Sequence, residues 1–145
     1  MLVIDASAAV ALLVDTGPDG TWAEQVLARE QLVAPHLMPV EAANILRRAA
    51  ARGEISADAA TLAHADLLAL RVDLFPYEPF ALRVWELREN LTAYDAWYVA
   101  LAEALGAKLA TLDGALCGES GPRCGFLTPR CGVEVQHPRG GSYFP

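Results

Sequence analysis

Lysine is almost missing from this chain of 145 residues: Lys108 is the only one, and the other basic residues are arginines. Aspartate and glutamate outnumber lysine and arginine by 18 to 11, which gives a net charge of −7. This balance argues against a broad electrostatic grip on nucleic acid. It is still compatible with a local basic face, and it includes any carboxylates that metal ions would neutralise.

The sequence also lacks long apolar runs. No stretch approaches the ~20 apolar residues that span a bilayer. The N-terminal segment has no positively charged region of the kind that begins a signal peptide, and Asp5 interrupts its apolar run. Three cysteines, an odd number, do not suggest a secreted disulfide framework. We therefore expect a cytoplasmic protein that makes no use of a membrane.

Several familiar catalytic motifs are absent. The chain has no Walker loop and no G-x-G-x-x-G fingerprint. Neither His36 nor His64 comes with a serine or cysteine nucleophile in an identifiable elbow. A hydrolase of the Ser/His/Asp type is therefore disfavoured.

Residues 114–132 are the least regular segment, rich in glycine and proline. We expect a loop there, around at most one short helical turn. The segment carries Cys117, Cys124 and Cys131, and His137 follows. A zinc site of three cysteines and a histidine is conceivable, but the two-residue knuckle spacing is absent, so we favour reduced, partly buried thiols.

Apolar residues make up 54% of the chain, and short apolar runs alternate with amphipathic segments. We expect strands at residues 2–5, 32–35, 72–77, 108–113 and 133–137. We expect helices at residues 6–14, 21–30, 38–52, 80–89 and 92–105, and one capped by Ser56 that runs to about Leu70. This alternation predicts an α/β fold of three layers, α/β/α, with a five-stranded parallel sheet joined by right-handed crossovers. Because we find no repeat and no linker, residues 1–145 form a single domain.

Four carboxylates stand where strands end or helices begin. Asp5 and Asp113 end strands, whereas Glu41 and Asp95 lie in the first turns of helices. In an open parallel sheet these places meet at one edge, beside the crevice where such sheets bind ligands. We therefore expect all four side chains to face one crevice.

Three of these acids also have an ordinary structural explanation. Asp5 can cap the helix that follows it. Glu41 can simply interact favourably with the dipole of its helix, and Asp113 can be an ordinary turn residue. Taken singly, each explanation is as good as a functional one.

Asp95 is harder to explain by structure alone. It can form a capping box with Thr92. However, it is the only charged residue in the segment 91–102, whose apolar residues lie nearly all round the helix. A carboxylate in such surroundings needs an ion pair, hydrogen bonds or a metal.

Carboxylates that are brought close together repel, so some must be protonated or bind cations. Oxygen ligands suit Mg²⁺ or Mn²⁺ rather than Zn²⁺. One such cation lowers the pKa of a water for attack on phosphorus, and a second, roughly 4 Å away, stabilises the leaving oxygen. The four acids therefore predict metal-dependent phosphate chemistry, with Asp5, Glu41, Asp95 and Asp113 as catalytic residues and metal ligands.

Other polar residues have supporting positions. Ser7 and Thr111, each two residues from an acid, could hold a water or orient a ligand, or could bond to the local backbone. Asn44 shares the face of Glu41 one helical turn further on. Arg48, another turn on, could meet a phosphate or remain a solvated surface arginine.

Three segments of the chain resemble signature blocks of the PIN-domain family, in particular the VapC-type toxin ribonucleases of VapBC toxin–antitoxin pairs. They are LVIDAS at the start, PVEAANILRR in the middle and LTAYDAWYVALAEALGAKLATLD near the end. The resemblance covers residues 1 to about 116, and the stretch 117–132 departs from it. The residues that match family positions are the acids Asp5, Glu41, Asp95 and Asp113, the hydroxyl residues Ser7 and Thr111, and Asn44.

This resemblance implies a Mg²⁺- or Mn²⁺-dependent endoribonuclease that acts on RNA and is held inactive by a cognate VapB-like antitoxin. It also implies the strand order 3-2-1-4-5, a homodimer and a hetero-oligomer with the antitoxin. The helices at 6–14 and 21–30 would offer a groove to the antitoxin if their apolar residues were partly exposed. These residues are Val10, Leu13, Trp22 and Val26.

Three other interpretations remain open. A PIN nuclease could process RNA outside any toxin pair. A receiver-like signalling domain also clusters acids at a sheet edge, but it needs two adjacent acids after its first strand and a lysine ending its last strand, which this chain lacks. A binding module without catalysis would not need the intact set of acids.

Overall fold

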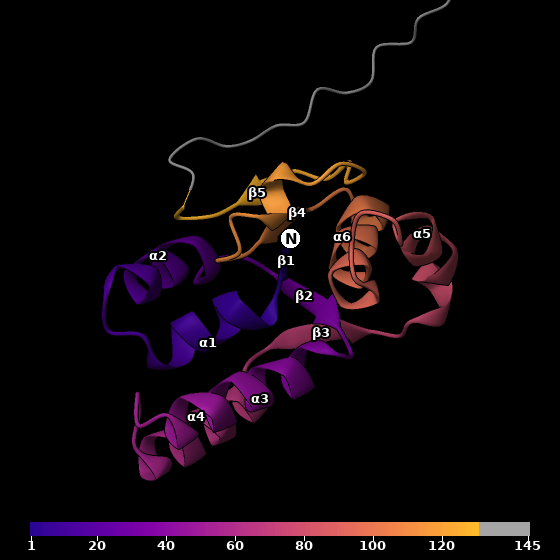
Figure 1. The fold of residues 1–145 in the computed structure, drawn as a ribbon. Helices are drawn as coiled ribbons and strands as arrows, with labels where there is room; N and C mark the ends of the chain where they lie inside the picture. The colour runs from indigo at the N-terminus through magenta and orange to yellow at the C-terminus, as the bar shows by residue number, and fades with distance from the viewer. Residues whose placement is uncertain (131–145) are drawn as a thin grey trace, which may run out of the picture.

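The computed structural model describes residues 1–130 and contains a twisted sheet with helices on both faces (Figure 1). Its strands are β1 (Leu2–Ile4), β2 (Leu32–Pro35), β3 (Val72–Phe75), β4 (Lys108–Ala110) and β5 (Phe126–Leu127). Neighbouring strands pair in parallel in the order β3-β2-β1-β4-β5. The expected α/β fold, the parallel sheet and the 3-2-1-4-5 order are confirmed.

Helices connect these strands. They are α1 (Ala6–Val14), α2 (Pro18–Leu27), α3 (Met38–Ala51), α4 (Ala57–Ala69), α5 (Ala81–Glu86) and α6 (Ala93–Leu105). Two 3₁₀ turns are added, η1 (Glu78–Phe80) and η2 (Leu116–Gly118). Figure 1 shows α1 and α2 on one side of the sheet and α5 and α6 on the other. The pair α3 and α4 packs against α1. None of the helices within residues 1–130 has the length and hydrophobicity to cross a bilayer.

Local capping sets where the helices begin. The side chains of Asp5, Ser56 and Thr92 accept hydrogen bonds from the first turns of α1, α4 and α6. Gly106 ends α6 in the left-handed region, at φ 61°, where glycine pays no steric cost. These caps place Asp5 and Asp95 at the starts of two helices, as the sequence predicts.

Strand β1 lies in the middle of the sheet, and its three side chains are buried. Val3 pairs with Val33 of β2 on one side and with Leu109 of β4 on the other. Buried residues of α6, such as Val99, cover one face of this centre. The carboxyl end of β1 therefore delivers Asp5 to the middle of the sheet edge.

Some boundaries differ from our expectations. α2 begins at Pro18 rather than residue 21, because proline suits a first helical turn. Its Gly20 lies so close to α1 that an added Cβ would be 1.8 Å from the carbonyl oxygen of Asp15. The helix expected at 80–89 is divided into η1 and the shorter α5. β3 and β4 are also shorter than expected, ending at Phe75 and Ala110.

The fifth strand needs a correction. We expected residues 114–132 to be irregular apart from one helical turn, but Phe126–Leu127 pair with β4 as β5. Phe126 is 1% exposed and belongs to the hydrophobic core. An apolar run of two residues is too short to stand out in sequence. The run 133–137, which we expected to be this strand, lies outside the described residues.

Candidate active site

Asp5 lies at the centre of a hydrogen-bond network. Its Oδ1 accepts from the Ser7 hydroxyl at 2.6 Å and from the Ala8 backbone amide at 2.9 Å. Its Oδ2 accepts from the hydroxyl of Thr111. Both oxygens of the carboxylate are therefore oriented by donors from α1 and from the segment after β4.

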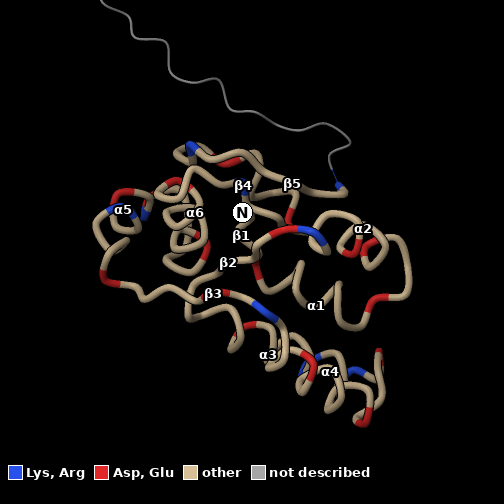
Figure 2. The backbone as a smooth tube through the Cα atoms, turned by 180° about the vertical axis from the view of Figure 1, so that it is seen from behind, with Lys and Arg blue, Asp and Glu red and all other residues tan. Residues whose placement is uncertain are grey.

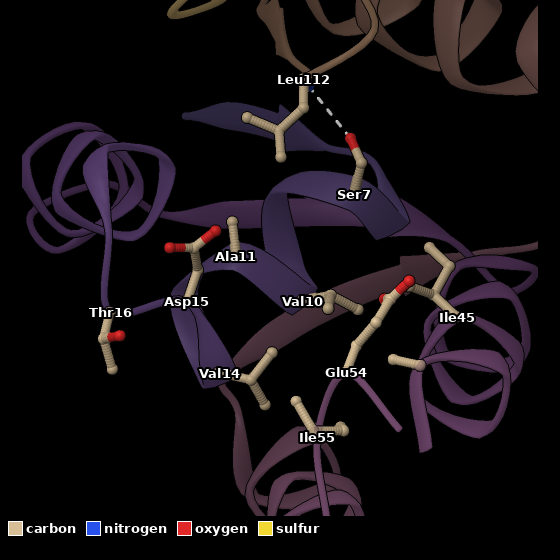
Figure 3. A pocket seen from close by; sticks show the side chains of 11 residues that line it. Ser7, Val10, Ala11, Val14, Asp15, Thr16, Ile45, Glu54, Ile55 and Leu112 are labelled. Carbon is tan, nitrogen blue, oxygen red and sulfur yellow. Dashed lines mark hydrogen bonds between the residues drawn. The ribbon is translucent and has the colours of Figure 1, made fainter. Parts of the chain in front are cut away.

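Ser7 and Thr111 also hold the backbone that follows β4. The Ser7 oxygen accepts from the Leu112 amide at 3.0 Å, a bond drawn in Figure 3. The Thr111 oxygen accepts from the Asp113 amide at 2.9 Å. Thr111 is fully buried. The two hydroxyls thus link the Asp5 carboxylate to the 111–113 segment, and we call these bonds the Asp5 clasp.

Glu41 stands in the first turn of α3. Its Oε1 accepts a hydrogen bond of 2.7 Å from the hydroxyl of Tyr98. Tyr98 is buried and lies one turn after Asp95 on α6. Our sequence reasoning missed Tyr98, although its spacing of three from Asp95 places both residues on one helix face.

Asp95 and Asp113 complete the acidic set. The Asp95 backbone amide donates to the Thr92 hydroxyl at 3.2 Å, so the capping interaction is present. Asp113 is exposed, and its Oδ1 accepts from the Ala115 amide at 3.0 Å, so it also serves a turn. The structural explanations and the functional one therefore coexist in the same residues.

The carboxylates influence one another electrostatically. Burial raises the pKa of Asp5, and the charge of Asp95 adds to this, against the bonds from Ser7, Thr111 and the Ala8 amide. Burial is likewise the main cause of the raised pKa of Asp95, and the charge of Asp113 contributes.

Glu41 is subject to the same two effects. Burial raises its pKa, and the charges of Asp95 and Asp5 raise it further, whereas the bond from Tyr98 lowers it. These interactions link Asp5, Glu41 and Asp95 into one cluster and connect Asp113 to it through Asp95.

This donor set suits a hard divalent cation, because all four candidate ligands are carboxylates and a cation would relieve their repulsion. Within residues 1–130, however, no three His, Cys, Asp or Glu side chains are placed closely enough to form a ready-made metal cage. The carboxylates would therefore have to close on a cation, or contact it partly through bound waters, which Mg²⁺ usually retains.

Other predicted residues lie apart from this cluster. Asn44 is exposed on α3, and its Oδ1 accepts from Arg47 Nε at 3.0 Å. Cys117 and Cys124 are buried thiols, and burial raises the pKa of Cys124 to about 12. Cys131 and His137 of the conceivable zinc site lie outside the described residues.

Charge is distributed as the composition suggests. Figure 2 shows the basic residues scattered among acidic ones over the described chain. An ion pair between Arg83 Nε and Glu103, at 2.7 Å, joins α5 to α6. Glu103 also accepts from the Arg123 amide at 2.7 Å, so this pair holds the segment before β5 in place.

A groove of about 390 Å³ adjoins the Asp5 clasp (Figure 3). Ser7 and Leu112 lie at the end that meets the clasp. The apolar lining comes from α1, α3 and the turn before α4, and includes Val10, Val14, Ile45 and Ile55. Asp15 and Glu54 add two carboxylates to it. The groove is therefore apolar inside and acidic at its margins.

The family model of the PIN domain matches residues 2–117 of this chain. A VapC ribonuclease of Mycobacterium bovis, Mb0985, is 45% identical over 113 residues, which cover 78% of this chain and 86% of that protein. The chain therefore belongs to the PIN-domain family, and the resemblance noted in its sequence is confirmed. The curated relatives to which it is similar are VapC ribonucleases.

Solved structures agree on the fold. VapC20 of Mycobacterium tuberculosis, described as a toxin that cleaves the sarcin-ricin loop, gives a TM-score of 0.63 at 18% identity over 81% of this chain and 94% of that one. A toxin–antitoxin complex from Klebsiella pneumoniae gives 0.55 at 19% identity, over 78% and 87%.

Proposed function

We propose that this protein is a VapC-type endoribonuclease toxin that hydrolyses phosphodiester bonds of RNA with the help of Mg²⁺ or Mn²⁺. One observation carries the proposal: three half-buried carboxylates, Asp5, Glu41 and Asp95, have raised pKa values because of burial and mutual repulsion. Such a cluster is costly without a cation. The ribonuclease names of the curated relatives support RNA as the substrate.

Each acid has a proposed part. Asp5 presents a carboxylate whose orientation is set before a cation arrives, because hydroxyls and an amide hold both of its oxygens. Glu41 and Asp95 face it from α3 and α6 and would share the cation with it. Asp113 is more exposed, so it would serve an outer cation or its waters. A bound divalent cation supplies the Lewis acidity that activates water and stabilises charge on phosphate oxygens.

The supporting residues divide into two kinds. Ser7 and Thr111 act through Asp5, which they orient. Asn44 and Arg48 are exposed on α3 beyond Glu41, so they would contact the RNA backbone rather than the cation. These two residues supply only local contacts, in keeping with the negative net charge of the chain.

Cleavage of RNA by purified variants tests this proposal. Asp95→Asn should lower the rate with Mn²⁺ by roughly 100-fold or more, beyond the 10- to 100-fold typical of outer-shell partners. Asp113→Ala should lose less. The control is Asp66→Asn, which makes the same change at an exposed position of α4 and should leave the rate unchanged. Wild-type cleavage by Asp95→Asn, or equal cleavage with Mn²⁺ and with a chelator, contradicts the proposed mechanism.

We also propose a VapB-like antitoxin as partner, bound in the groove beside the clasp. An amphipathic segment would place its apolar side chains against Val10, Val14 and Ile55. Basic residues of that segment would meet the groove's carboxylates and, at its inner end, the acidic cluster. Leu13, Trp22 and Val26, which we expected to share this surface, are partly buried against the core as Val10 is, but they do not line this groove. The groove thus lies between α1 and α3 rather than between α1 and α2.

A further inference from the structure

Tyr98 connects two helices that carry acids of the cluster. It is 3% exposed and projects from α6 one turn after Asp95. Its hydroxyl donates to Glu41 Oε1 at 2.7 Å, across to the first turn of α3. The bond joins residues 57 apart in sequence, so only the folded chain can form it.

The bond engages one of the two carboxylate oxygens of Glu41, Oε1. Within residues 1–130, Oε2 has no donor and is the oxygen left for another partner.

Electrostatic repulsion acts against the place of Glu41 in the cluster. Its side chain has three rotatable bonds, and the charges of Asp95 and Asp5 both act against it. Because α3 begins at the surface, solvent is the alternative place for this carboxylate. A single charge-assisted bond from a buried, rigid ring opposes that escape.

We infer that Tyr98 is a positioning residue, whose hydroxyl holds Glu41 in the acidic cluster with one carboxylate oxygen free for a divalent cation. The inference deepens the proposed function and rests on it. Tyr98 touches neither substrate nor cation; it acts through Glu41.

Calorimetric titration of the purified protein with Mn²⁺ tests this without reference to cleavage. Tyr98→Phe keeps the ring and removes the hydroxyl, and we expect Mn²⁺ to bind roughly 10- to 100-fold more weakly, as for other outer-shell partners. Tyr94→Phe is the matched control, since Tyr94 is a 61% exposed tyrosine on the same helix. It should bind Mn²⁺ as the wild type does.

A double variant separates positioning from a general loss of structure. Glu41→Gln should weaken Mn²⁺ binding, and adding Tyr98→Phe to it should weaken binding no further, because the two residues act as a unit. Wild-type affinity in Tyr98→Phe overturns the inference. So does an equal further loss in the double variant.

A crystal structure of the wild type with Mn²⁺ gives a measurement that needs no variant. Tyr98 should still bond one oxygen of Glu41 while the other faces the ion. An ion bound by both oxygens, with the tyrosine detached, overturns the inference. If the wild type binds no Mn²⁺, the proposed function fails instead. In that case, metal-free crystals of the wild type and of Tyr98→Phe test the role of Tyr98. The Glu41 side chain should lose its single rotamer in Tyr98→Phe, and an unchanged Glu41 conformation overturns the inference.

Discussion

Thr111→Val is the sharpest perturbation of the Asp5 clasp. Valine has nearly the shape of threonine but lacks the hydroxyl, and Thr111 is fully buried, so no water can take its place without rearrangement. The change removes two hydrogen bonds at once. One is donated to the Asp5 carboxylate, and the other is accepted from the Asp113 amide.

The size of the effect follows from these two bonds. A hydrogen bond to a charged group contributes about 1.5–3 kcal/mol, and a neutral one about 0.5–1.5 kcal/mol. Because Asp113 is exposed, its amide can regain water, so the second value belongs at the low end. We therefore expect Thr111→Val to lower the free energy of unfolding by about 2–4 kcal/mol.

Urea unfolding without metal, followed by circular dichroism, measures this loss. With a slope of about 2 kcal/mol per molar urea, the midpoint should fall by roughly 1–2 M. Thr61→Val is the control, because its hydroxyl only bonds the Ala57 carbonyl on exposed α4, and it should change stability by less than about 0.5 kcal/mol. A midpoint for Thr111→Val within the error of the wild type refutes the clasp as a stabilising contact.

Two further predictions concern charge and the groove. Because the folded state raises the pKa of Asp5, Glu41 and Asp95, it binds protons more tightly than the unfolded chain does. Without metal, the urea midpoint should therefore rise as the pH falls from neutrality through these raised pKa values toward the ordinary carboxyl range. Asp95→Asn should flatten this pH profile. Millimolar Mn²⁺ should raise the midpoint at neutral pH. A wild-type profile that falls steadily over that window would contradict the cluster. Val14→Glu should weaken antitoxin capture in co-purification by at least about 10-fold while RNA cleavage persists. The control Leu62→Glu, on exposed α4, should leave antitoxin capture unchanged. Undiminished capture by Val14→Glu would place the interface elsewhere.

The acidic cluster was predictable because its positions follow from topology. Asp5 directly follows a buried apolar run, and Asp95 stands alone in an apolar helix, so both were visible as outliers in the sequence. The carboxyl ends of parallel strands share one edge, and this alone brings residues 5, 95 and 113 together. No distance in the fold was needed for that conclusion.

Side-chain partners were harder to foresee. Tyr98 looks in sequence like another core aromatic of α6, and only the folded chain brings its hydroxyl to Glu41 in the first turn of α3. Asn44 has the right helical spacing, yet it turns to Arg47 at the surface. Periodicity tells which face a residue occupies, whereas the partner depends on how two elements cross.

The Asp5 clasp also changes what inactive variants can show. Removing one acid from the cluster relieves repulsion, and this effect alone would leave the protein folded. Asp5, however, accepts three hydrogen bonds, including those that hold the segment after β4. Asp5→Ala would therefore lose cleavage and stability together, and Asp95→Asn is the cleaner inactive form for trapping RNA.

The bond between Thr111 and Asp5 joins residues 106 apart in the chain. A ribosome adds roughly 5–20 residues per second, N-terminal part first. The nascent chain therefore carries Asp5 for roughly 5–20 seconds before Asp113 exists. During that interval β1 lacks its β4 neighbour and the cluster lacks its last acid. The acidic cluster, and with it the proposed cleavage of RNA, can therefore form only after Asp113 has been synthesised.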